Sequence, residues 1–463
     1  MRRAVIAPSV FLVALSGAPL HAQSLPAKAA VARVADSLAN AFLAAKESPS
    51  VAIAVIRGAD TLVFGAWGKA DLENDVAATP TSVYRIGSVT KQFTSAAVMQ
   101  LVEKGLVKLD APIGTYLATL PAEWKPVTVR QLLNHTSGIP SYTDIGEAWA
   151  RRWGEIMTPD TLVALTAGKK MDFAPGTSWH YNNTGYVLLG MLIEKVTGHA
   201  WGTELADRFF TPLGLTATRN CLNEPLVTHR AAGYQKAANG WSNAQYLAMS
   251  QPYSAGAMCS TIGDLATWNR ALHGGKVVSA ESYKLMTTPE GAAATAALKY
   301  GFGLGRDTLA GHPIVTHGGG IHGFITGNAW VPELALSVTV LTNSGDAKAD
   351  QLLAQLVRAA AGAPLKQPPK AVAATAAQRA HVVGKYALNL GGTVREFSVF
   401  EREGALYGQL EGQSAIPLNF LGNDTWGASF DASLRLIFDA AGTTASTMTL
   451  KQGGGEFTGQ RKP

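Results

Sequence analysis

Ser88 and Lys91 stand three residues apart, just ahead of an apolar stretch that predicts a helix over residues 93–107. On a helix this spacing places both side chains on one face, so that the amine can reach the hydroxyl. Ser88 could instead be a plain N-cap, but a capping box would need Glu or Gln where Lys91 stands. The helix dipole disfavours a cation in the first turn. We expect this dipole and partial burial to lower the pKa of Lys91, leaving an amine able to take the serine proton.

Two further segments carry groups that could take part in catalysis. Tyr181 and Asn183 precede a second predicted helix, over residues 186–196, and offer a phenol that can move a proton and an amide that can donate to a carbonyl. His317 is the first residue of a glycine cluster that extends to Gly320 beside a predicted strand. Such a cluster lets a substrate approach the backbone and lets an N–H point at a developing oxyanion. Taken alone, the first segment could be a helix-capping loop and the second a plain turn.

The three segments together resemble the penicillin-recognising serine hydrolase family, in the branch of class C β-lactamases, DD-peptidases and related esterases. The motifs are Ser-x-x-Lys at Ser88 and Lys91, Tyr-x-Asn at Tyr181 and Asn183, and His-Gly-Gly from His317, where the family usually has Lys-Thr-Gly. The stretches 84–93 and 132–140 are also typical of this branch, and the resemblance covers about residues 31–361. It implies an α/β fold, a β-lactamase-like sandwich of an antiparallel sheet flanked by helices plus an all-α region.

The resemblance also implies an acyl-enzyme mechanism that uses no metal or cofactor. Ser88 would be the nucleophile, and Lys91 and Tyr181 would share the general base and acid roles, with the division between them open. The backbone N–H groups of Ser88 and Gly320 would form the oxyanion hole. Asn183 would orient the substrate, and His317 would line the strand edge near the Tyr181 hydroxyl. The stretch 134–138 matches no catalytic motif of the family, and we interpret it as structural.

His317 shifts the expected substrate. A lysine there would supply a permanent cation for a substrate carboxylate, whereas histidine is mostly neutral at pH 7. A histidine here also resembles aminopeptidase and esterase members of the family. We therefore expect an exported serine hydrolase, esterase-like or D-aminopeptidase-like, that acts on esters or on small peptides and amides. A β-lactamase or DD-carboxypeptidase is the first alternative. A binding or sensor protein that is acylated without turnover is the second.

Other catalytic plans fit the sequence less well. No serine lies in Gly-x-Ser-x-Gly, the nucleophile elbow of α/β-hydrolases. His180, His199 and His322 lack the His-x-x-x-His spacing with an adjacent Glu that marks a zinc protease, and we interpret them as structural. Cys221 and Cys259 are the only cysteines, and whether they form a disulfide stays open.

The 463 residues divide into four predicted parts. Residues 1–22 have the basic start, the apolar stretch and the small residues at the cleavage site that are typical of a signal peptide. This pattern predicts a periplasmic or secreted protein without stable membrane insertion. Residues 23–362 form the hydrolase domain, with a first helix over 31–45, a hairpin after it and a last helix over 349–361. Residues 363–382, rich in proline and alanine, are expected to be a linker. Residues 383–463 show the alternating pattern of short strands and resemble the lipocalin-like β-barrel of some family members. Such a barrel could restrict the cleft, mediate self-association or only pack against the hydrolase domain, and the sequence leaves these alternatives open.

Composition excludes several classes of protein. Hydrophobic residues make up 47% and charged residues 16% of the chain, which argues against global disorder. The formal charge of +6 includes Arg2 and Arg3 of the signal segment, so the mature chain should carry about +4. The basic residues form no run, and we expect no nucleic-acid partner.

Overall fold

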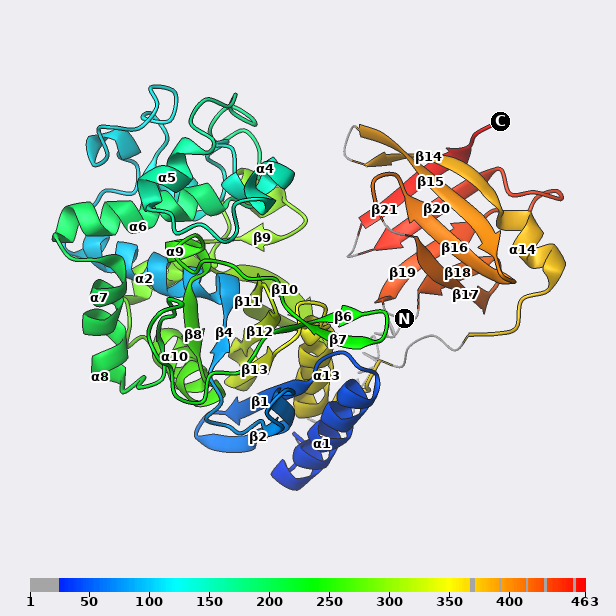
Figure 1. Cartoon of the computed structure of the whole chain (residues 1–463), viewed down its shortest axis with the longest axis horizontal. Helices are drawn as coiled ribbons and strands as arrows, with labels where there is room; N and C mark the ends of the chain where they lie inside the picture. Colours follow the sequence, from blue (N-terminus) through cyan, green and yellow to red (C-terminus); the bar gives the residue numbers. More distant parts are fainter. Residues whose placement is uncertain (1–24, 367–370, 391–392, 414, 429–430, 453–454) are drawn as a thin grey trace, which may run out of the picture.

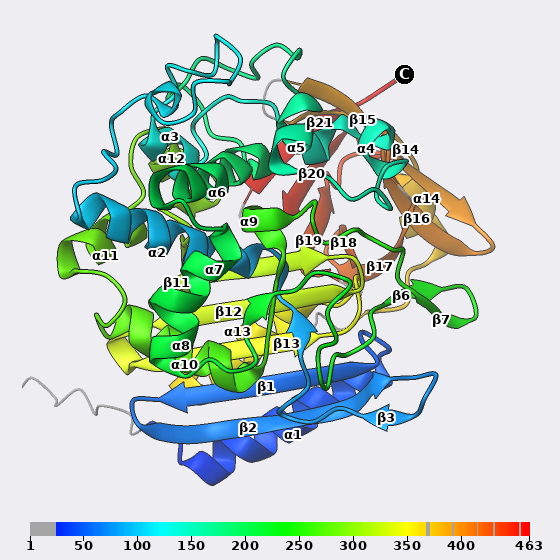
Figure 2. The same ribbon diagram turned by 60° about the vertical axis from the view of Figure 1, so that its left-hand side comes forward.

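The structure is a computed structural model that describes residues 25–366, 371–390, 393–413, 415–428, 431–452 and 455–463. The predicted signal peptide therefore lies outside the described residues. The larger part of the chain is built on an antiparallel eight-stranded sheet (Figures 1 and 2). Its strands, in spatial order, are β3 Val76–Ala77, β2 Asp60–Asp71, β1 Ser50–Arg57, β13 Leu336–Thr342, β12 Phe324–Val331, β11 His312–Ile321, β10 Gly305–Leu309 and β9 Lys299–Tyr300.

Both faces of this sheet are buried. Along β1, Val51, Ile53 and Val55 pack into one hydrophobic cluster, and Ala52 and Ala54 pack into another, as the period of two in a strand requires. The first cluster is closed by α1 Lys28–Ala44 and α13 Ala349–Ala361, which also contact each other. The sheet is therefore the middle layer of a sandwich, as expected from the sequence.

The second cluster joins the other face of the sheet to a helical region (Figure 2). The centre of this region is α2 Thr90–Glu103 and α6 Asn183–Thr197, which pack against each other and against the short α9 Tyr253–Gly256. The remaining helices are α3 Val129–Leu133, α4 Glu147–Ala150, α5 Pro159–Ala164, α7 Trp201–Leu205, α8 Thr211–Leu213, α10 Ile262–His273, α11 Ala280–Thr287 and α12 Ala292–Thr295.

Two small sheets complete this part of the chain. One consists of β4 Tyr84–Arg85, β8 Met258–Ser260 and β5 Arg219–Asn220, and the other of β6 Tyr234–Ala237 and β7 Gly240–Asn243. Cys221 and Cys259 are joined in a disulfide that ties the end of β5 to β8. The sequence did not decide whether this disulfide forms, and the structure contains it.

The C-terminal part is a closed barrel of eight antiparallel strands, drawn in orange and red in Figure 1. Its strands are β14 Gly384–Leu390, β15 Thr393–Arg402, β16 Ala405–Leu410, β17 Ile416–Gly422, β18 Thr425–Ala428, β19 Asp431–Phe438, β20 Thr447–Gln452 and β21 Gly455–Arg461. The interior is packed with apolar side chains such as Tyr386, Phe397 and Trp426. The predicted fold class, a β-lactamase-like sandwich followed by a small all-β barrel-like domain, is confirmed.

The predicted linker 363–382 is not wholly a connecting segment. Its last third forms a helix, α14 Ala376–Val382, which begins with a capping box between Thr375 and Gln378. Val382 at the end of this helix is buried in the barrel core. The helix thus belongs to the barrel, because its end helps to fill the barrel interior. Among all described residues, no helix has both the length and the apolar character needed to cross a bilayer.

Candidate active site

Ser88 and Lys91 lie where the helical region meets the sheet. Ser88 is in a 3₁₀ turn, Gly87–Val89, which runs directly into α2, so the three-residue spacing brings both side chains together as predicted. Ser88 is partly exposed, whereas Lys91 is fully buried. The Nζ atom of Lys91 is 3.2 Å from Ser88 Oγ and donates to Asn183 Oδ1 and to the carbonyl oxygen of Ala255, each at 2.8 Å.

Among the residues that the structure describes, no carboxylate is a hydrogen-bond partner of this lysine. Burial lowers the pKa of Lys91 well below its ordinary value of 10.5. A neutral amine has two N–H groups and one lone pair. The two N–H groups match Asn183 and Ala255, and the lone pair then faces the Ser88 hydroxyl. The geometry is therefore that of a buried amine poised to accept the serine proton.

Tyr181 lies over the same lysine, with its ring centre 4.7 Å from Lys91 Nζ. Its hydroxyl is buried without a hydrogen-bond partner among the described residues, although the nearby Ser88 hydroxyl stabilises its ionised form. Burial outweighs this effect and raises the pKa of Tyr181 far above its ordinary value. Tyr181 is thus a protonated phenol with a free donor next to the nucleophile.

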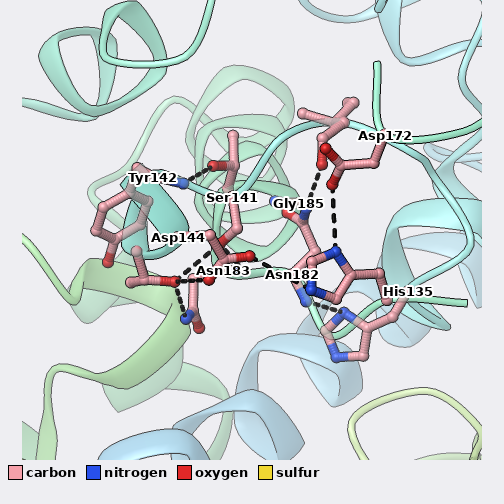
Figure 3. A network of polar contacts seen from close by, with 12 residues as sticks. His135, Ser141, Tyr142, Asp144, Asp172, Asn182, Asn183 and Gly185 are labelled. Atoms are coloured by element: carbon pink, nitrogen blue, oxygen red, sulfur yellow. Dashed lines mark hydrogen bonds and ion pairs between the residues drawn. The ribbon is translucent and has the colours of Figure 1, made fainter. Parts of the chain in front are cut away.

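The start of α6 holds this loop in place, as Figure 3 shows. Asn182 is the N-cap, and its side chain accepts from the Gly185 N–H. The Asn182 N–H in turn donates to Nδ1 of His135. The His135 ring is fully buried, and its centre lies 4.4 Å from that of Tyr181. His135 therefore packs behind the Tyr181 ring, and it has a positive φ of 64°, which is uncommon for a non-glycine residue.

Asn183 connects the lysine to the rim of the site. Its Oδ1 accepts from Lys91, and its Nδ2 donates to Thr143 Oγ1 at 3.1 Å. Its backbone N–H donates to Ser141 Oγ (Figure 3). The oxygen and the nitrogen of the amide thus each have a partner, which fixes the oxygen toward the lysine.

The glycine cluster forms a free strand edge beside Ser88. Strand β10 pairs with β11 only as far as Gly305 opposite Thr316, so residues 317–321 pair with β12 alone. A Cβ on Gly319 would lie 2.0 Å from the carbonyl oxygen of Ile86, and a Cβ on Gly87 would lie 2.9 Å from the nitrogen of Gly320. The absence of side chains therefore brings the Gly320 N–H close to the nucleophile turn, where an oxyanion hole with the Ser88 N–H would have to lie.

His317 does not supply the cation that a lysine would offer to a substrate carboxylate at this position. Its Nδ1–H donates to the carbonyl oxygen of Gly318 at 2.5 Å, and its Nε2 accepts from the Tyr300 hydroxyl at 2.7 Å. Burial lowers the pKa of His317 to about 3. His317 is thus neutral, and its hydrogen bond goes to Tyr300 rather than to Tyr181, whose ring centre is 6.2 Å from its own.

Two cavities meet at Ser88 and Gly320. The larger has a volume of about 450 Å³ and is lined by Asn183, Tyr142, Trp149 and Ile321, among others. The smaller, of about 300 Å³, lies on the side of Tyr181 and His317 and includes Leu298 and Tyr300. Among the described residues that line them there is no lysine or arginine and one carboxylate, Asp346. The nucleophile therefore lies between two largely uncharged subsites.

The structure brings together Ser88, Lys91, Tyr181, Asn183, His317 and Gly320, all of which the sequence singled out. Sequence reasoning missed three contributors: the Ala255 carbonyl, Tyr300, and His135, which lies in the stretch interpreted as structural. That stretch directly follows α3, which begins with a capping box, a signal that could have marked it as a rigid part of the site. Tyr300 and Ala255 carry no motif.

The three histidines that the sequence analysis interpreted as structural have other partners, although one of them, His322, lines the larger cavity. His180 approaches Asp144 and Asp172, His199 contacts Glu204, and His322 contacts the carbonyl oxygen of Gln245. Within the described part of the chain, no three His, Cys, Asp or Glu side chains are grouped so that they could hold a metal ion.

Comparison with known proteins relates the larger domain to a family of known proteins. The β-lactamase family model matches residues 35–385. A D-aminopeptidase of Brucella ovis is 28% identical over 331 residues, which are 71% of this chain and 62% of that protein. The chain thus spans less than two thirds of the length of that relative.

Two solved structures extend the comparison. A D-stereospecific amidohydrolase of Streptomyces is 32% identical with a TM-score of 0.61, and the match covers 72% of this chain and 98% of that one. The octameric penicillin-binding protein homologue of Pyrococcus abyssi is 26% identical with a TM-score of 0.65, and covers 92% of this chain and 99% of its own. These relatives agree with the predicted enzyme class, the serine hydrolases. The chain belongs to the β-lactamase family.

Proposed function

We propose that this protein is a serine hydrolase that acts through an acyl-enzyme on Ser88 and cleaves small amides, peptides or esters. The observation that carries the proposal is the buried Lys91 amine, 3.2 Å from the Ser88 hydroxyl and without a carboxylate partner. A buried lysine kept neutral in this way is suited to act as a general base and is difficult to explain as a structural ion.

The division of roles follows from the two pKa shifts. Lys91, with a lowered pKa, takes the proton of Ser88 as Ser88 Oγ forms a bond to the substrate carbonyl carbon. Tyr181, with a raised pKa, keeps its proton until the leaving nitrogen or oxygen departs, and then supplies it. The N–H groups of Ser88 and Gly320 stabilise the oxyanion. Proton transfer from Lys91 back to Tyr181 resets the pair, and water then releases the acyl group by the same steps.

The neutral His317 favours substrates without a carboxylate next to the scissile bond. The cavities beside Ser88 offer no cation for such a group, which makes β-lactams and carboxyl-terminal peptides poorer substrates. The D-aminopeptidase and the D-stereospecific amidohydrolase among the relatives favour amides or peptides of D-amino acids. We place D-amino-acid amides first, esters second and β-lactams third.

The test is a screen of the protein from residue 23 onward against D- and L-amino-acid amides, p-nitrophenyl esters and a chromogenic cephalosporin, each also with Ser88→Ala. Mass spectrometry with an activated ester should find a transient adduct on Ser88. A stable adduct without release would support the sensor alternative. Full activity of the Ser88→Ala variant would refute the mechanism.

The proposed site of action is the periplasm or the exterior of the cell. The support is the signal-peptide pattern of residues 1–22. N-terminal sequencing of the exported protein should begin near Gln23. For self-association, the support is the octameric relative, whose match covers 92% of this chain and therefore extends into the barrel. Light scattering of the whole chain, compared with residues 23–362, tests whether the barrel mediates it.

A further inference from the structure

His135 holds the chain on both sides of Tyr181. Its carbonyl oxygen accepts from the His180 N–H at 3.1 Å. Its Nδ1 atom accepts from the Asn182 N–H, also at 3.1 Å (Figure 3). His180 and Asn182 are the two neighbours of Tyr181 in the chain. One residue, from a distant segment, therefore fixes the path of the backbone through Tyr181.

The His135 ring also contacts the Tyr181 ring. Its centre lies 4.4 Å from that of Tyr181, and 4.6 Å and 5.1 Å from those of Tyr300 and Tyr186. The imidazole thus packs against three phenol rings. The Tyr181 hydroxyl has no hydrogen-bond partner among the described residues. The place of this phenol beside Lys91 therefore depends on its backbone and on its ring contacts.

Packing alone does not explain why this residue is a histidine. Because Nδ1 accepts a hydrogen bond, the proton of the neutral ring is on Nε2, which is buried without a partner among the described residues. Burial lowers the pKa of His135 well below 6.5, so the ring is neutral. A phenylalanine would fill the space without burying an unpaired N–H. The φ of 64° is also unfavourable for a residue with a Cβ. What histidine adds is the Nδ1 acceptor.

We propose that His135 is a positioning residue for Tyr181, and that it keeps the phenol hydroxyl within reach of the leaving group at Ser88. This role rests on the proposed function, in which Tyr181 protonates that group. A general acid acts only within hydrogen-bonding distance of the atom that it protonates. A shift of about 1 Å can lower a rate about a hundredfold. Loss of the His135 contacts should therefore impair substrates that need the acid more than substrates that do not.

The test compares two substrates made from the same D-amino acid, its amide and its p-nitrophenyl ester. The nitrogen that leaves from the amide needs a proton, whereas p-nitrophenolate leaves without one. The ratio of the two kcat/KM values reports on the acid and is independent of the amount of folded protein. In His135→Phe, which keeps a flat ring but lacks the acceptor, we expect the amide-to-ester ratio to fall about 10- to 100-fold. His135→Asn should retain part of the ratio, because its side chain offers an acceptor and asparagine tolerates a positive φ.

Two further variants make the test specific. His273→Phe is the matched control, because burial also keeps His273 neutral but His273 is not among the described residues that line either active-site cavity. It should leave the ratio unchanged. Tyr181→Phe should lower the ratio by itself, and adding His135→Phe to it should have no further effect on the ratio, because both changes act through one group.

The outcomes separate this role from the proposed function. If His135→Phe slows both substrates equally, or lowers the ratio further in the Tyr181→Phe background, the positioning role is overturned and the proposed function stands. An unchanged ratio in Tyr181→Phe, or hydrolysis of neither substrate by the unaltered protein, refutes the proposed function and the positioning role with it. If His135→Phe does not fold, His135→Asn is compared with His135→Gly, which also tolerates the positive φ but offers no acceptor. The proposal then requires the higher ratio in His135→Asn, and equal ratios overturn it.

Discussion

Replacing Asn183 by aspartate should convert the proposed base into an ammonium. The side-chain oxygen of Asn183 is 2.8 Å from Lys91 Nζ, so Asn183→Asp places a carboxylate there with no change in size. At an effective dielectric constant of about 20, two unit charges at this distance attract by about 6 kcal/mol. Burying the new carboxylate offsets part of this attraction, and ion pairs typically shift a pKa by about 1–3 units.

We take a rise of about 2 units in the pKa of Lys91, or about 2.7 kcal/mol, as the expected effect. The acid limb of the pH profile should therefore move up by about 2 pH units, so that below both pKa values the neutral fraction of Lys91, and with it kcat/KM, falls about a hundredfold. The loss should be recovered at alkaline pH, because the amine is only protonated and not removed. The assay is kcat/KM for the best substrate from pH 5 to 10.

Two variants serve as controls. Asn183→Ala removes the hydrogen bond without adding charge, and its loss of activity should not recover at high pH. Asn40→Asp adds the same charge on an exposed position of α1, away from the site, and should leave the profile unchanged. An unchanged profile in Asn183→Asp would refute the assignment of Lys91 as the base that must be neutral.

Three further predictions concern other parts of the site. Tyr181→Phe should lower kcat by about 10²–10⁴ but leave the melting temperature equal or higher, since the hydroxyl has no partner to lose; unchanged kcat would exclude Tyr181 as the acid. Gly319→Ala should abolish activity because its Cβ would lie 2.0 Å from a backbone oxygen, whereas Gly318→Ala, whose nearest atom is 3.6 Å away, should be tolerated; equal activity of both would contradict the close approach. Burial lowers the pKa values of His273 and His317 to about 3, so below pH 6.5 the unfolded state binds more protons than the folded state. Denaturant titrations should find the full free energy of unfolding above pH 6.5, and a loss of about 1 kcal/mol per histidine per pH unit as the pH falls from there toward 3. Equal stability at pH 7.5 and 5.5 would contradict the burial of these two rings in their neutral form.

Much of the scaffold could be predicted because its signals are local. The helix predicted over 349–361 is α13 with the same bounds, since its apolar positions follow the helical period and a glycine stops it. The residues of the site were predictable for a related reason. Ser88 and Lys91 need only the spacing of one helical turn, and the free edge at His317–Gly320 needs only glycines next to a strand.

What escaped prediction depends on contacts between distant segments. Tyr300 reaches His317 only because β9, β10 and β11 pair in a particular register. No sequence pattern near Tyr300 predicts this contact. The Ala255 carbonyl reaches Lys91 across 164 positions of the chain. The helix α14 is a different case, because the Thr375–Gln378 capping-box pattern stands in the sequence but was not considered when the prolines before it led to the prediction of a linker.

The electrostatics of the site have a common direction. Among the described residues, the hydrogen-bond partners of Lys91 are oxygen acceptors without a carboxylate, and burial holds the His317 ring beside it neutral. Burial is also the cause that lowers the pKa of Lys91. Neutral groups therefore surround the nucleophile, and the amine can accept the Ser88 proton without first losing one of its own.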